Sequence, residues 1–217
     1  MKYEEKEKYL KELIEGNQSE FDFEMIKLLS KDKDNQIRYL VAEAVGNLEQ
    51  PKLGEILYEL LYDSSYLVRI QAIQSIPDKI DSKLWEKIKD MSQKDKNYLV
   101  RGYALGAYSN YVEFSDITSM REFVFDRLDK EKYGFNKIFA YSSLYMLGDE
   151  RSIYPLIRMF DSKNYRNKCA VLNSLLDILN EKNKDIIKQF VDKKNKNKFP
   201  NSIQPLFDEL VEELAKL

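Results

Sequence analysis

The chain has 217 residues, of which 43% are hydrophobic and 33% charged, a composition typical of a folded protein with a strongly solvated surface. Its formal charge of −2 gives no general signal for binding a polyanion. It contains no histidine, the residue that proteins use most often as a general base or metal ligand. We therefore expect no enzymatic activity, no cofactor and no bound metal.

Three features of the sequence bear on its compartment. Residues 1–16 are charged throughout and lack the apolar segment and cleavage site of a signal peptide. No run of apolar residues is long enough to cross a membrane. The single cysteine, Cys169, cannot form an internal disulfide, so we expect a cytoplasmic protein that does not contact membranes.

Apolar residues recur at steps of three and four along the chain, which predicts an all-α protein. Residues 1–18 should form an N-terminal capping helix, and five helices should follow at 21–31, 52–62, 82–93, 119–130 and 152–160. Pro51 suits a first helical turn, and Ser119 with Glu122 suggests a capping box. Each of these helices is followed by a short polar turn and a second helix.

The second helices share a repeated phrase, seen as "LVRIQAIQSI" and again as "LVRGYALGAY". A basic residue recurs at positions 38, 69, 101, 137 and 168, at intervals of 31, 32, 36 and 31 residues. The sixth residue after it is always small, and the seventh is always large and apolar. A fixed period of this length is typical of a solenoid, in which each hairpin must stack on its neighbours to bury its apolar face.

These hairpins, with valine or isoleucine before the arginine and small residues at fixed offsets, resemble the HEAT repeat family, in particular short bacterial HEAT-like repeats. The most similar stretch is "LGDERSIYPLIRMFDS" at 147–162. The resemblance implies a right-handed α-solenoid of about five to six repeats with helical caps, forming a single domain over 1–217. Five repeats would occupy 19–180, and 181–217 would hold an atypical last repeat and a capping helix. The longer interval before Lys137 suggests a looser turn at 131–136.

The resemblance also implies a role for the repeated basic residue, which would lie near the start of each second helix and reach the polar groups of an adjacent turn. Its members would form a structural ladder that holds successive repeats in register: Arg38, Arg69, Arg101, Lys137 and Lys168. The alternative is that the same residues form a basic stripe that follows nucleic-acid phosphates.

Helical geometry predicts which residues of the second helices point away from the core and line a concave binding face. The predicted face comprises Tyr39, Glu43, Ile70, Gln74, Gly102, Gly106, Ile138, Tyr141, Tyr145 and Asn173. Only Glu43 among them is charged, and the two glycines should leave the middle of the groove open. Aromatic residues with few charges are typical of a protein contact surface, although burial between the helices would give the same pattern.

These features predict a non-catalytic scaffold or adaptor that binds another protein through its concave face. One such role would be an immunity or regulatory partner of another bacterial protein. The alternative is a nucleic-acid-binding protein resembling the HEAT-like DNA-alkylation glycosylases. The nearly neutral face and the absence of tryptophan from it make binding to nucleic acid the weaker hypothesis.

Overall fold

The computed structural model describes residues 1–16, 21–48, 50–194 and 199–217. These residues form thirteen α-helices and four 3₁₀ helices and contain no strand, which confirms the all-α prediction. The helices up to residue 108 are α1 (Tyr3–Ile14), α2 (Phe23–Leu29), α3 (Asn35–Leu48), η1 (Pro51–Leu53), α4 (Gly54–Leu60), α5 (Tyr66–Gln74), α6 (Ser82–Lys94) and α7 (Tyr98–Tyr108). The later helices are η2 (Val112–Phe114), α8 (Ile117–Lys130), α9 (Gly134–Met146), η3 (Glu150–Ser152), α10 (Ile153–Arg158), η4 (Met159–Asp161), α11 (Tyr165–Ile178), α12 (Lys184–Lys194) and α13 (Gln204–Lys216).

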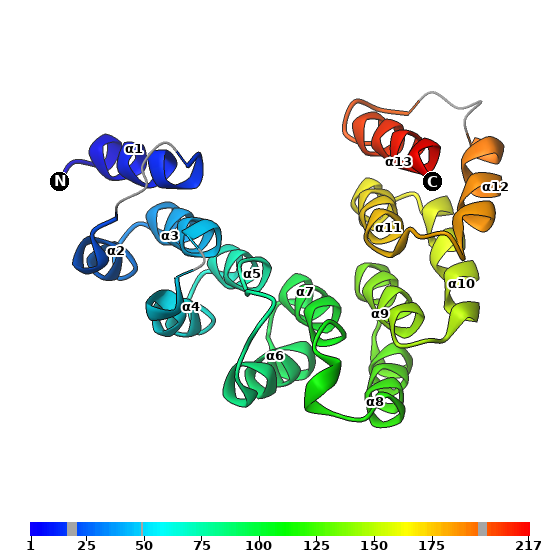
Figure 1. Cartoon of the computed structure of the whole chain (residues 1–217), viewed down its shortest axis with the longest axis horizontal. Helices are drawn as coiled ribbons and strands as arrows, with labels where there is room; N and C mark the ends of the chain where they lie inside the picture. The colour runs from blue at the N-terminus through cyan, green and yellow to red at the C-terminus, as the bar shows by residue number, and fades with distance from the viewer. Residues whose placement is uncertain (17–20, 49, 195–198) are drawn as a thin grey trace. The chain divides into compact units, whose positions relative to one another are not determined.

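The chain divides into two compact units, Met1–Ala107 and Tyr108–Leu217. In unit 1, helices α1, α3, α5 and α7 form one row, and α2, α4 and α6 form a second row (Figure 1). In unit 2, helices α9, α11 and α13 form one row, and α8, α10 and α12 form the other (Figure 1). The single array expected over 1–217 stays a prediction.

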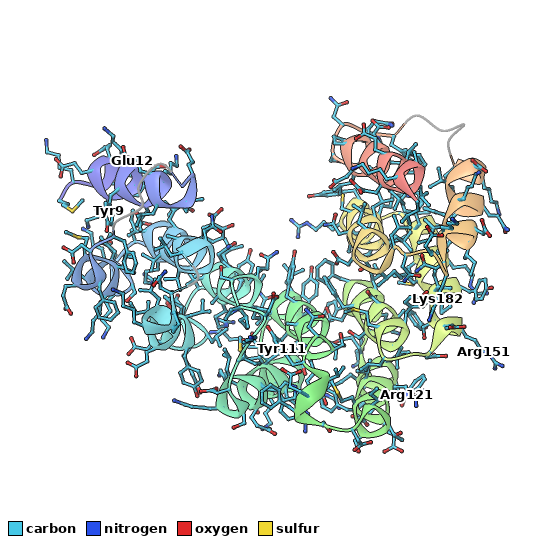
Figure 2. The ribbon with its side chains drawn as sticks, in the orientation of Figure 1. Tyr9, Glu12, Tyr111, Arg121, Arg151 and Lys182 are labelled. Atoms are coloured by element: carbon cyan, nitrogen blue, oxygen red, sulfur yellow. The ribbon has the colours of Figure 1, made fainter. Side chains whose placement is uncertain are left out.

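The N-terminal helix α1 packs against α3, as the capping prediction requires. Leu10 and Leu13 are buried, and the side-chain amide of Asn47 near the end of α3 donates a hydrogen bond of 2.9 Å to the carbonyl of Ile14. Tyr9 lies between α1 and α2 (Figure 2), where its hydroxyl accepts a hydrogen bond of 3.1 Å from the Asp22 amide. The apolar stripe of α1 therefore covers the first hairpin.

Small residues allow neighbouring second helices to approach closely. Gly46 of α3 lies against Ser75 at the end of α5, and a Cβ atom at Gly46 would lie 2.8 Å from the Ser75 Cβ. In unit 2 the small position is occupied by Ser143, which is fully buried and accepts a hydrogen bond of 3.1 Å from the Ser109 hydroxyl. The sixth repeat position is small because a helix backbone passes close to it.

The C-terminal helices are held by a cluster of four phenylalanines. Phe160 of η4 stacks edge-on against Phe190 of α12 and Phe199, at centroid distances of 5.2 and 5.6 Å. Phe207 of α13 completes the cluster at 4.9 Å from Phe199 and is almost fully buried. Helix α13 also packs on α11, so it covers the last second helix with its apolar face.

Two local expectations are wrong. Asp116, rather than Ser119, caps α8, because its carboxylate accepts a hydrogen bond of 2.9 Å from the Ser119 amide one turn later. The turn at 131–133 is short, and Glu131 holds it by accepting hydrogen bonds from the amides of Lys132 and Tyr133. The extra residues of the long repeat lie before α8, in the segment that contains η2.

Candidate functional site

The first feature of the site is a ladder of charged residues along the turns of unit 1. The guanidinium of Arg38 donates to both carboxylate oxygens of Asp63, at 2.6 and 2.8 Å, and to the carbonyl of Asp32 at 2.7 Å. Asp63 follows α4, so this bidentate pair joins the first hairpin to the turn of the next. Such fork-to-fork pairing fixes geometry as well as charge.

Arg69 repeats the arrangement one hairpin later. It donates to both oxygens of Asp95 at 2.8 Å and to the carbonyl of Asp63 at 2.7 Å. Arg101 continues the ladder by donating to the carbonyl of Asp95 at 3.0 Å. Asp63 and Asp95 therefore each link two arginines, one through the side chain and one through the backbone.

The ladder aspartates also hold the turns that precede the second helices. Asp32, Asp63 and Asp95 each accept a hydrogen bond from the amide two residues later, at 2.8–2.9 Å. Burial alone would raise the pKa of Asp63, but hydrogen bonds from Arg38 and the Ser65 amide lower it below its ordinary value. A hydrogen bond from Lys6 lowers the pKa of Asp32 in the same way. Asp32 and Asp63 therefore stay ionised in the folded state at neutral pH.

The equivalent turns in unit 2 keep the local hydrogen bond but change the residues. Glu131 accepts from the amide of Tyr133 at 3.1 Å, and Ser162 accepts from the amide of Asn164 at 3.2 Å. Lys168 donates to the carbonyl of Phe160 at 2.8 Å, whereas Lys137 is half-buried on α9. Lysine cannot form a bidentate fork, so the unit 2 turns are linked differently from those of unit 1.

These contacts bear on the hypothesis that the basic residues follow phosphates. The side chains of Arg38 and Arg69 are only 12% and 5% exposed, and each guanidinium is neutralised by an aspartate. A phosphate contact would require both ion pairs to be broken and both aspartates to be left unpaired. The arrangement opposes phosphate binding by these two residues.

The second feature is the exposed side of the second helices within each unit, which we call the second-helix face. Of its predicted members, Gln74 and Asn173 are exposed, and five are half-buried: Tyr39, Glu43, Gly106, Tyr141 and Tyr145. The prediction is wrong for Ile138, which is completely buried, and for Ile70, which is 8% exposed. Gly102 is also buried, so it does not open a groove as expected.

The burial of the isoleucines follows from the number of neighbours around each second helix. Helix α9 contacts α8, α10 and α11, and helix α5 contacts α3 and α4. A helix enclosed on several sides buries more than the single stripe that a helical wheel assigns to the core. Tyr145 is partly enclosed as well, since its hydroxyl accepts a hydrogen bond of 2.9 Å from the side-chain amide of Asn183.

In unit 1, Tyr39 of the second-helix face interacts electrostatically with Glu43 on the same helix and with Tyr103 on α7. Tyr39 and Glu43 are four residues apart on α3 and so project from the same side of the helix. Burial and the charge of Glu43 raise the pKa of Tyr39, while burial and Tyr39 raise the pKa of Tyr103 on α7. Sequence reasoning missed Tyr103, which lies one position further round its helix than Tyr39. Both phenols therefore remain neutral at physiological pH.

Other kinds of site leave little trace in the described part of the chain. No cluster of three or more acidic or cysteine side chains there is arranged to hold a metal ion. None of the helices described is long and apolar enough to cross a bilayer. The chain matches no model of a known protein family and no curated protein.

Proposed function

We propose that the chain is a right-handed α-solenoid of HEAT-like helical hairpins that serves as a non-catalytic scaffold and binds another protein through the second-helix face. The ladder of Arg38, Arg69 and Arg101 supports this proposal, because it repeats one linkage at regular spacing. Regularly linked hairpins provide a rigid surface, and rigid surfaces lose little entropy on binding.

The observation that carries the proposal is the composition of the second-helix face. One-third of the chain is charged, yet Glu43 is the only charged residue among the seven predicted members of this face that are exposed or half-buried. Tyr39 and Tyr141 are half-buried there, each with an amphipathic ring of the kind enriched at protein interfaces. A partner that covers these rings would gain apolar contact without desolvating many charges.

The experiment is affinity capture from the native host with a variant that removes both rings, Tyr39→Ala with Tyr141→Ala. Tyr154→Ala is the matched control, because Tyr154 is 53% exposed on α10, outside the second-helix face. We expect the wild type and the control to retain the same partner and the double variant to lose it while keeping its helical circular dichroism. Equal capture by a folded double variant would overturn the proposal.

Within this class we favour a regulatory or immunity protein that acts on another bacterial protein. If this role is right, the activity of the captured partner must change when the purified scaffold is added at stoichiometric concentration. A partner whose activity is unaffected would support a passive adaptor instead.

A further inference from the structure

Glu43 differs from every other half-buried carboxylate that the structure describes in unit 1. The others all have a hydrogen bond or an ion pair: Glu7, Glu12, Asp32, Asp34, Asp63, Asp90 and Asp95. Glu43 has neither with any described residue, and the hydroxyl of Tyr39 beside it has no hydrogen-bond partner among them either. Neither group is committed to a hydrogen bond with the described residues, so both are available to a group supplied by a ligand.

The surroundings of Glu43 narrow the chemistry of a ligand. Tyr39 offers a neutral phenol on the same side of α3, and Tyr103 on α7 is close enough to interact electrostatically with Tyr39. Gln74 on α5 adds an exposed amide to the same face. The cluster thus combines one carboxylate, two aromatic rings and neutral hydrogen-bonding groups.

Three classes of partner side chain can be compared. An acidic group would be repelled by Glu43, and an apolar group would bury its carboxylate further without a hydrogen bond. A cationic group would neutralise the carboxylate and stack on the rings. Arginine suits the cluster better than lysine, because its planar fork can donate to the carboxylate and the phenol together while stacking on an aromatic face.

We propose that the cluster of Tyr39, Glu43 and Tyr103 binds an arginine side chain presented by an extended segment of a partner protein. This inference rests on the proposed scaffold function and names the chemistry that its unit 1 surface recognises. The arginine would supply the partner that Glu43 lacks among the described residues.

The test is a fluorescence anisotropy titration with a labelled glycine–serine nonapeptide that contains three arginines. A second peptide carries citrulline in place of each arginine, which keeps the shape and removes the charge. At low salt, where screening is weak, we expect the arginine peptide to bind the wild type about tenfold more tightly than the citrulline peptide, in line with one charge-assisted contact.

Glu43→Gln should remove the same factor of about ten, and Tyr103→Leu should weaken binding by a smaller factor. The matched control is Glu24→Gln, since Glu24 is an exposed carboxylate on α2, and it should bind as the wild type does. Because Glu43 has no hydrogen bond or ion pair with the residues that the structure describes, Glu43→Gln should keep the wild-type melting temperature, which separates lost binding from lost folding. Equal binding by Glu43→Gln and wild type, equal binding of both peptides, or no binding of the arginine peptide would each overturn the inference.

Affinity capture distinguishes a failure of the arginine-site proposal from a failure of the scaffold proposal. A native partner lost by the double tyrosine variant but fully retained by Glu43→Gln would overturn the arginine site and keep the scaffold. A partner retained by the double tyrosine variant would overturn the scaffold, while the peptide titration would still report on Glu43.

Discussion

Arg69 and Asp95 are 26 residues apart in the chain and face each other through two parallel hydrogen bonds of 2.8 Å. Their side chains are 5% and 9% exposed, so the pair is nearly removed from water. A buried pair contributes little relative to a well-packed apolar pair, but loss of one member leaves an uncompensated charge. Single substitutions in the ladder should therefore lower the stability of the protein severely.

Arg69→Met should lower the free energy of unfolding by about 3 kcal/mol or more, because Asp95 would lose its bidentate partner in a buried position. Lys94→Met is the control, since Lys94 is 73% exposed in its ion pair with Asp90 and such surface pairs contribute about 0.5 kcal/mol or less. Urea titration followed by the fluorescence of Trp85, the single tryptophan, reports on unit 1 directly. Similar costs for the two variants would contradict a structural role for the ladder.

The pH dependence of stability should follow the aspartates. Hydrogen bonds from Lys6 to Asp32 and from Arg38 to Asp63 keep both carboxyl pKa values below their ordinary range. An aspartate with a depressed folded pKa stabilises the protein above its unfolded pKa of about 3.9, and this contribution disappears as the pH falls toward the folded value. We expect the unfolding free energy of unit 1 to decrease below about pH 4.

Urea titrations between neutral pH and pH 3 would measure this decrease. Asp63→Asn should flatten the acid limb of the curve, because the side chain no longer takes up a proton on unfolding. Asp78→Asn should leave the limb unchanged, because Asp78 is an exposed loop residue. If Asp63→Asn kept the wild-type slope, the acid sensitivity would have to arise elsewhere.

The sequence specified the helices and turns well because the repeat signal is local. Each ladder aspartate lies six residues before an arginine, as Asp63 does before Arg69. That spacing is the signal that could have identified the ladder, since both residues belong to one turn. The bidentate pairs, such as Arg69 with Asp95, join different hairpins. They depend on how one hairpin stacks on the next, which the spacing along the chain does not encode.

The second-helix face was harder to predict for a different physical reason. A helical wheel assumes one buried side, whereas Ile70 and Ile138 are enclosed by several helices and are buried. Tyr103 was missed because a rotation of one residue moves it out of the ideal outward positions. The partnerless state of Glu43 depends on which side chains surround it, so only three-dimensional packing reveals it.

Close packing between second helices gives a third prediction. Gly46→Ala should destabilise unit 1 by about 1 to 2 kcal/mol, because its Cβ would lie 2.8 Å from the Ser75 Cβ and overpacking outweighs the better helix propensity of alanine. Gly54→Ala is the control, since no atom lies within 4 Å of its added Cβ, and it should be neutral or stabilising.

A second substitution tests the origin of the clash. Ser75→Gly combined with Gly46→Ala should recover part of the lost stability, because it removes the Cβ and hydroxyl that the new methyl group meets. The recovery should be incomplete, as the Ser75 Cα would still lie 3.1 Å away. Purely additive costs, measured by Trp85 fluorescence, would argue that the two positions do not interact.

The last prediction concerns the end of unit 2. Phe207 of α13 is almost fully enclosed there and is only 1% exposed. Phe207→Ala should cost about 3 to 5 kcal/mol, because it removes a ring from the cluster with Phe190 and Phe199. Phe125→Ala removes a ring that is 47% exposed on α8 and should cost about 0.5 kcal/mol or less.

Truncation after Asp192 removes Phe199 and Phe207 together and uncovers Phe160 and Phe190. An apolar face without its cap should promote association, so we expect a lower melting temperature and concentration-dependent aggregation by light scattering. A truncated protein that is as stable and soluble as the full chain would show that α13 does not act as a cap. Helix α13 would then be free to serve as a binding element. That result would argue against the second-helix face as the principal contact surface.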